Sequence, residues 1–224
     1  MRIANIVVGI VLTFAAGGGA SAEPFSFDPP GKLVPNSGTG STDAIVFAPG
    51  IRFPLEEGPA FANSQVHGFG GSVKGGSQCH HDNYVFPWHD NFCETRSRAT
   101  GACPLGKGHQ GQDIRPRTCR KDTHFAVAVE NGEISDIGSF TVTLLGDSGT
   151  LYRYLHMNMN RLQVREGDRV TAGQRLGLVS NFFGGTPTTI HLHFEILKNS
   201  PTRGFQHVPP YMSLVRAFER LQGS

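Results

Sequence analysis

Residues 188–196 read Thr-Thr-Ile-His-Leu-His-Phe-Glu-Ile, and this stretch decides both the expected fold and the expected chemistry. Apolar and polar residues alternate along it, which predicts a β-strand with one buried face and one polar face. The polar face carries His191, His193 and Glu195, and two histidines so placed lie about 7 Å apart. Such a pair can hold a metal with one ring and act on a substrate with the other. The alternative is an ordinary solvated face.

A second stretch, His-Gln-Gly-Gln-Asp-Ile at residues 109–114, has the same kind of pattern. His109 and Asp113 share one face of an extended chain, and Gly111 between them has no side chain that could block a metal. Neutral imidazole and carboxylate together suit Zn²⁺. Alone the pattern is weak, because a surface strand can carry His and Asp by chance.

Length and composition predict one mainly β domain. The chain has 224 residues, 38% of them hydrophobic, and its 29 Gly and 14 Pro indicate many turns. A net charge of +2 is too small to indicate a nucleic-acid partner, and we expect none.

The N-terminus predicts export. One Arg, an apolar run over residues 3–16 and small residues up to Ala22 are typical of a secretory signal peptide over residues 1–22. The apolar run is too short to span a bilayer, so we expect no stable membrane span after cleavage; an uncleaved anchor is the alternative. The expected location is the periplasm or the extracellular space. Residues 23–43 are rich in Pro, Gly and Ser and predict a linker or leader.

Four cysteines, Cys79, Cys93, Cys103 and Cys119, fit an exported protein with two disulfides. They lack the Cys-x-x-Cys pairs of a structural zinc site. Three pairings are possible, and we favour the nested one, in which Cys93–Cys103 lies inside Cys79–Cys119.

The segment between the first cysteines carries a rival metal cluster, His80-His81-Asp82 with His89-Asp90. Neighbouring residues in an irregular loop do not share a face, so we interpret this segment as a disulfide-stapled insertion. Trp88 and Phe92 would then line a groove beside it.

Short alternating runs predict a sheet of mostly antiparallel strands, and Leu214, Val215, Phe218 and Leu221 predict a short C-terminal helix from about Pro210. Glycine-spaced runs over residues 164–180 suit tight turns in a compact sandwich; they also resemble biotinyl or lipoyl carrier domains, but the required lysine is absent. The expected strands are residues 44–48, 51–55, 125–129, 132–137, 140–145 and 150–156.

Three signals, His-x-Gly-x-Asp, Tyr-x-His and His-x-His, occur in this order, and together with the Gly-Asp-x-Val-x-x-Gly-Gln stretch they are specific. Over residues 51–200 the chain resembles the lysostaphin/LytM-type zinc metallopeptidases, which are peptidoglycan endopeptidases. The resemblance implies a compact antiparallel β core within a zinc metallopeptidase domain at residues 44–224, holding one Zn²⁺ per chain. By the same resemblance, the zinc ligands are His109, Asp113 and His193, and the catalytic histidines are His156 and His191.

The resemblance implies a secreted zinc metalloendopeptidase that hydrolyses peptide cross-links or stem peptides of peptidoglycan, and we expect a monomer. Tyr154 and Thr188 are candidates for substrate contact. Glu195 is a candidate partner of a zinc ligand, although a surface salt bridge is the more common use of such a residue. The alternatives are a non-catalytic envelope module that binds wall peptides or activates another hydrolase, and a zinc peptidase with a protein substrate. The long insertion before His109 departs from the family pattern and puts the substrate in doubt.

Overall fold

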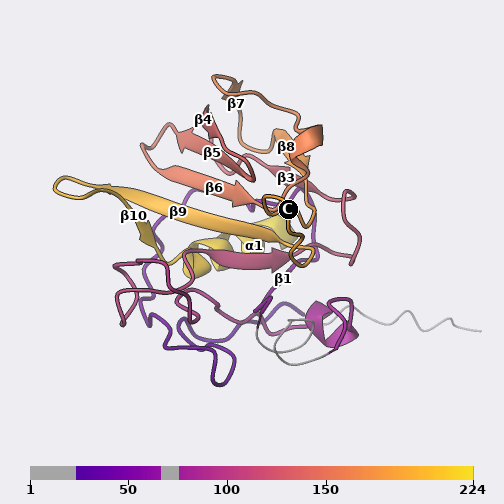
Figure 1. Cartoon of the computed structure of the whole chain (residues 1–224), viewed down its shortest axis with the longest axis vertical. Coiled ribbons are helices and arrows are strands. Elements are labelled where there is room, and N and C mark those ends of the chain that lie inside the picture. The colour runs from indigo at the N-terminus through magenta and orange to yellow at the C-terminus, as the bar shows by residue number, and fades with distance from the viewer. Residues whose placement is uncertain (1–23, 67–75, 224) are drawn as a thin grey trace, which may run out of the picture.

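The computed structural model describes residues 24–66 and 76–223 (Figure 1). The predicted signal peptide at residues 1–22 lies outside the described residues. Within them, no helix is both long enough and apolar enough to cross a membrane. The elements are β1 (Phe61–Ala62), η1 (His81–Tyr84), β2 (Gln112–Arg115), β3 (Phe125–Val127), β4 (Gly132–Ile137), β5 (Thr141–Gly146), β6 (Leu151–Leu155), η2 (Met159–Arg161), β7 (Arg169–Val170), β8 (Arg175–Leu178), β9 (Leu192–Ser200), β10 (Gly204–Val208) and α1 (Tyr211–Gln222).

An antiparallel sheet of eight strands dominates the described part of the chain, in the order β1-β2-β9-β6-β5-β4-β7, with β10 paired to the far end of β9. β3 and β8 form a separate two-stranded sheet. The fold is therefore mainly β and antiparallel with a short C-terminal helix, as the sequence predicts.

β9 is the centre of the large sheet. It pairs with β6 along one edge and with β2 and then β10 along the other. Leu192, Phe194 and Ile196 are fully buried in the core, whereas His191, His193 and Glu195 point to the opposite side. The predicted alternation is confirmed, but the strand begins at Leu192 and continues to Ser200, because its second half pairs with β10.

Two other sequence predictions differ from the structure. Residues 44–48 and 51–55 form no strand; Leu55 makes only an isolated bridge to Ala126. Ile51, Phe53 and Leu55 are buried nonetheless, so the apolar spacing reflects packing against the core rather than strand pairing. β10 was not predicted, because its residues are only partly buried or exposed and show no apolar alternation.

The helix α1 packs its apolar face on the core and crosses behind β9 and β2 in the view of Figure 1. Its Phe218 lies at the centre of an aromatic cluster, with ring centroids 4.6 Å from Trp88, 4.8 Å from Phe25 and 4.9 Å from Phe53. Phe25 belongs to the predicted leader, so that segment packs on the domain in the described structure. Trp88 is fully buried in this cluster and therefore does not line a groove.

We expect Phe218→Ala to destabilise the protein by about 3–5 kcal/mol, because it removes a fully buried ring that contacts three other aromatic side chains. Urea unfolding followed by circular dichroism measures the loss. Arg216→Ala, on the exposed side of the same helix, is the matched control and is expected to change stability by under about 0.5 kcal/mol. Equal stability of the two variants would contradict this account of the core.

The two disulfides are Cys79–Cys119 and Cys93–Cys103, which confirms the nested pairing. They brace the irregular segment 76–108, called the insertion below, which precedes β2. Phe92 is buried beside the inner disulfide in a small cluster of its own, so it does not line a groove either. The division into leader and catalytic domain stays a prediction.

Candidate metal centre and catalytic pocket

The sheet register places Asp113 of β2 directly opposite His193 of β9, so both side chains emerge on the same face. His109, just before β2, completes a group of three buried donors. Asp113 Oδ1 lies 2.9 Å from His193 Nδ1 and 3.4 Å from His109 Nε2, and the two ring nitrogens are 3.0 Å apart. Ligand atoms of a tetrahedral zinc site with bonds near 2.0–2.1 Å are about 3.3 Å apart, so these donors fit such a metal.

Gly111 allows this geometry. A Cβ at that position would lie 2.8 Å from His193 Nε2 and closer still to the carbonyl oxygen of Phe194. Any side chain there would push β2 away from β9 and separate the donors. The absence of bulk predicted from the sequence is therefore required by backbone packing as well as by the site.

In His109 and in His193, one ring nitrogen makes a hydrogen bond directed away from the candidate metal position. The other ring nitrogen is therefore the one that can bind a metal. His109 Nδ1 donates to the backbone carbonyl of Asn91 at 2.9 Å, which leaves the lone pair of Nε2 for a metal. His193 Nε2 donates to Glu195 Oε1 at 2.9 Å, which leaves Nδ1 as the nitrogen that can bind a metal. A carboxylate behind a ligating histidine is a frequent arrangement in metal sites, because it fixes the tautomer and raises ligand basicity.

The ionisation of the group also suits a cation. Burial alone would raise the pKa of Asp113, but His109 and His191 hold it well below its usual value, so the carboxylate is charged. Burial lowers the pKa of His109. Burial would also lower the pKa of His193, but hydrogen bonds to Asp113 and Glu195 raise it to about 9. A metal at Nδ1 would take the place of the proton held there.

Asn91 is a residue of this site that the sequence did not reveal. Its carbonyl accepts from His109, its Nδ2 donates to Asp113 Oδ2 at 2.9 Å, and its Oδ1 accepts from the Asp113 amide at 3.1 Å. One side chain and its carbonyl thus orient two of the three donors. Asn91 lies in the insertion, two residues before Cys93, where no periodic pattern marks it.

We expect Asn91→Ala to weaken metal binding by about 10–100-fold, because it removes the side chain that orients Asp113, whereas the backbone carbonyl that accepts from His109 stays in place. Competition with a chromophoric chelator measures the dissociation constant for zinc. Asn160→Ala, an exposed position at η2, is the control and should bind as the parent does. An unchanged affinity in a folded Asn91→Ala protein would show that the insertion does not support the site.

His191 and His156 border the same pocket, which has a volume of ≈ 270 Å³. His191 Nδ1 donates to the carbonyl of Thr189 at 2.9 Å, and its Nε2 lies 3.3 Å from Asp113 Oδ1. His156 Nδ1 donates to the carbonyl of Phe182 at 3.0 Å. Each ring therefore keeps Nε2 as its acceptor, and the two ring centroids are 4.6 Å apart. Burial, with His191 and His193 nearby, holds the pKa of His156 well below its ordinary value, so this ring is neutral.

Residues 107–203 match the model of peptidase family M23. This segment belongs to peptidase family M23. All five of the residues described above as donors or pocket histidines lie within it, and the resemblance to LytM-type peptidases predicted from the sequence is confirmed. No curated protein matches the chain.

Solved structures of lower similarity accompany this match. A LytM protein from Ruminococcus gnavus is 24% identical over 50% of this chain and 47% of that chain, with a TM-score of 0.44. The catalytic domain of the antimicrobial peptidase lysostaphin from Staphylococcus simulans is 23% identical over 56% of this chain and 90% of that domain, with a TM-score of 0.41. This chain thus spans about half of the first relative, and membership of the family rests on the matched segment.

Tyr154 of the M23 segment is in the core rather than in the pocket. It is fully buried, and its hydroxyl accepts from the amide of Val129 at 2.9 Å. Alternation had placed Tyr154 and His156 on one face. β6 ends at Leu155, however, and His156 has a left-handed backbone with φ of 70°, which turns its ring to the other side.

Glu195 and Thr188 are placed differently from one another. Glu195 is fully buried and, besides His193, contacts Arg153 at 2.8 Å and His207 at 3.1 Å, so the surface salt bridge expected for it is wrong. Thr188 borders the pocket of the M23 segment and stays a candidate for substrate contact.

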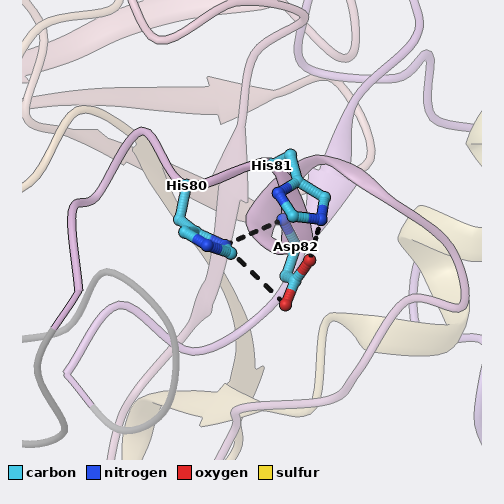
Figure 2. A group of neighbouring side chains, drawn as sticks. All are labelled: His80, His81 and Asp82. Carbon is cyan, nitrogen blue, oxygen red and sulfur yellow. Dashed lines mark hydrogen bonds and ion pairs between the residues drawn. The ribbon is translucent and has the colours of Figure 1, made fainter.

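The residues of the rival cluster do not line this pocket. They lie at the start of η1 (Figure 2). His80, His81 and Asp82 bring donor atoms within 4.8 Å of one another, so the group could hold a metal. Yet the His81 side chain is 80% exposed and its Nε2 pairs with Asp82 Oδ1 at 2.5 Å. Donors that are exposed or only half-buried and already pair with each other form a weaker site than the buried group of His109, Asp113 and His193.

Proposed function

We propose that the protein is an exported zinc metalloendopeptidase that hydrolyses peptide cross-links or stem peptides of bacterial peptidoglycan. The observation that carries the proposal is the convergence of three buried donors and two histidine acceptors on one pocket, within a segment of a peptidase family. A predicted signal peptide and two disulfides support export.

In this proposal His109 Nε2, Asp113 Oδ1 and His193 Nδ1 hold one Zn²⁺ per chain. Three protein ligands leave a further position for water or substrate, and zinc so bound supplies a Lewis acid and a water whose pKa falls to about 7. No Glu of a His-Glu-x-x-His helix is present to take a proton.

The two pocket histidines, His156 and His191, are therefore the groups that accept and donate protons during hydrolysis. Their Nδ1–H groups are held by backbone carbonyls, so Nε2 of His156 and His191 can accept a proton from the attacking water. Once protonated, a ring beside the scissile bond stabilises the developing oxyanion by charge and can return its proton to the leaving amine. The neutral state of His156 before reaction suits this role.

Mass spectrometry of the muropeptides released from purified, cross-linked peptidoglycan tests this function. We expect the zinc-loaded protein to convert cross-linked dimers to monomers, and expect a chelator or His191→Ala to prevent it. Intact dimers after treatment with protein of confirmed zinc content would contradict the proposal. Binding of muropeptides without turnover would then favour the non-catalytic envelope module, and cleavage of an oligoglycine peptide would favour a protein substrate.

A further inference from the structure

Two arginines of the insertion border the catalytic pocket. Arg96 and Arg98 both come from the loop closed by the Cys93–Cys103 disulfide, and both line the pocket beside His109 and His193. The sequence signals of the family lie elsewhere, in and directly beside β2, β6 and β9, so these arginines belong to the part of the chain that departs from the family pattern.

The loop that carries the arginines is tied to the chain that carries the metal donors. The His109 amide donates to the carbonyl of Glu94 at 2.9 Å, and the Cys93 amide donates to the carbonyl of His109 at 3.0 Å. Four residues further on, the Gly108 amide donates to the carbonyl of Arg98 at 2.9 Å. The backbone at positions 94 and 98 is therefore fixed relative to His109, and a disulfide closes the loop behind it.

Arg96 and Arg98 give the pocket a positive charge that no acidic residue beside them on the described pocket wall offsets. Asp113 is its only acidic residue among the described ones, and its carboxylate is directed to the histidines. Arg96 Nη1 donates to the carbonyl of Thr95 at 2.8 Å, and its Nη2 lies 3.4 Å from the buried Glu94, which orients the guanidinium. Arg98 is exposed, and among the described residues its guanidinium has no hydrogen bond or ion pair.

We propose that Arg96 and Arg98 form an anion subsite that binds a free carboxylate of the substrate peptide next to the scissile bond. The proposal rests on the proposed function and names the substrate class of that site: peptides with an ionised carboxylate near the cleaved bond, rather than neutral peptides such as oligoglycine stretches. A guanidinium suits this role, because its planar fork of N–H donors matches a carboxylate in two parallel hydrogen bonds. Stem peptides of peptidoglycan present such carboxylates both on side chains and at the C-terminus.

The test compares muropeptide dimers that differ only in one group. The first has all carboxylates free, the second has its side-chain carboxylates amidated, and the third has its C-terminal carboxylate amidated. We expect the zinc-loaded protein to cleave the free form with a kcat/KM at least about tenfold above that of one amidated form, and that form identifies which carboxylate is bound.

Arg98→Gln and Arg96→Gln are each expected to lower the rate on the free form more than the rate on the discriminated amidated form, and the double variant is expected to abolish the preference. Lys107→Gln is the matched control, because it removes a positive charge from the insertion at an exposed position that does not line the pocket. Equal rates on all three dimers, or equal losses on the free and amidated forms in Arg98→Gln, would overturn the proposal.

Binding separates this proposal from the proposed function. Fluorescence anisotropy of labelled dimers with His191→Ala, which lacks turnover, measures affinity alone. We expect the free form to bind at least about tenfold more tightly than the discriminated amidated form, and expect Arg98→Gln added to this background to remove the difference. If the parent protein cleaves none of the dimers, the proposed function fails, yet preferential binding would still support the carboxylate subsite. Equal binding of all forms would overturn the subsite.

Discussion

His193→Ala is expected to lose both bound metal and hydrolysis, the largest effect of any single substitution in this chain. Its Nδ1 is one of three donors, and a site left with only His109 and Asp113 binds zinc far more weakly. Elemental analysis after dialysis against metal-free buffer should find close to one zinc per parent chain and close to none per variant. Release of muropeptides should fall to background in the same preparation.

His81→Ala is the matched control for this prediction. It removes an exposed histidine from the cluster of His80, His81 and Asp82 and leaves the buried donors unchanged. Zinc content and activity are expected to equal those of the parent protein. The assignment of the metal to the buried group is wrong if the His81 variant loses zinc while the His193 variant keeps it.

His191→Ala is expected to keep its zinc and lose activity. The ring lies in the pocket but outside the group of three donors, so removing it takes away a proton acceptor and leaves the ligands in place. Loss of a positioned general base or acid lowers the rate by about 10²–10⁴-fold. Steady-state cleavage of a cross-linked dimer, with zinc content determined on the same samples, measures both quantities.

His156→Ala should behave in the same way, and the double variant should lose less than the product of the two single losses, because both rings serve the same proton transfers. His89→Ala, outside the pocket, is the control and should retain full activity. Zinc loss in His191→Ala would contradict the division between ligand and catalytic histidine. Full multiplicative loss in the double variant would show that the two rings act independently.

The sequence predicted the centre of the fold because the first half of β9 carries apolar side chains on one face and polar side chains on the other. Period-two alternation is strong in such a strand, so Leu192, Phe194 and Ile196 marked the core and His191 and His193 marked the functional face. At β2 the signal was the spacing of His109, Gly111 and Asp113, which share one face of an extended chain. The meeting of Asp113 with His193 was implied by the resemblance to the zinc metallopeptidases, and the register that places the two residues opposite one another came from the structure.

The prediction from alternation was wrong at the end of β6, where the backbone leaves the extended conformation. Tyr154 and His156 are two positions apart, yet the left-handed conformation of His156 sends its ring into the pocket while Tyr154 stays in the core. Nothing in the letters Tyr-Leu-His marks that turn. The apolar residues at 51–55 alternate in the same way without pairing, because burial alone produces such spacing.

The insertion was the least predictable part of the chain. Its three cysteines, together with Cys119 beyond it, indicated two disulfides. Asn91, however, acts through a backbone carbonyl and a side-chain amide that only the folded loop brings to His109 and Asp113. Arg96 and Arg98 likewise became candidates for substrate binding only when the structure placed them at the pocket. An irregular segment has no repeating apolar pattern from which the direction of its side chains can be predicted. Its contacts are therefore known only from the structure.

Titration of zinc into metal-free protein, with cleavage of cross-linked muropeptides measured at each step, tests the central claim most directly. The claim is that His109, Asp113 and His193 hold the one metal on which hydrolysis depends. The account predicts no cleavage without zinc, a linear rise with added metal and a plateau at one equivalent per chain. Full cleavage by the metal-free protein, or a rise that continues to a second equivalent, would contradict it.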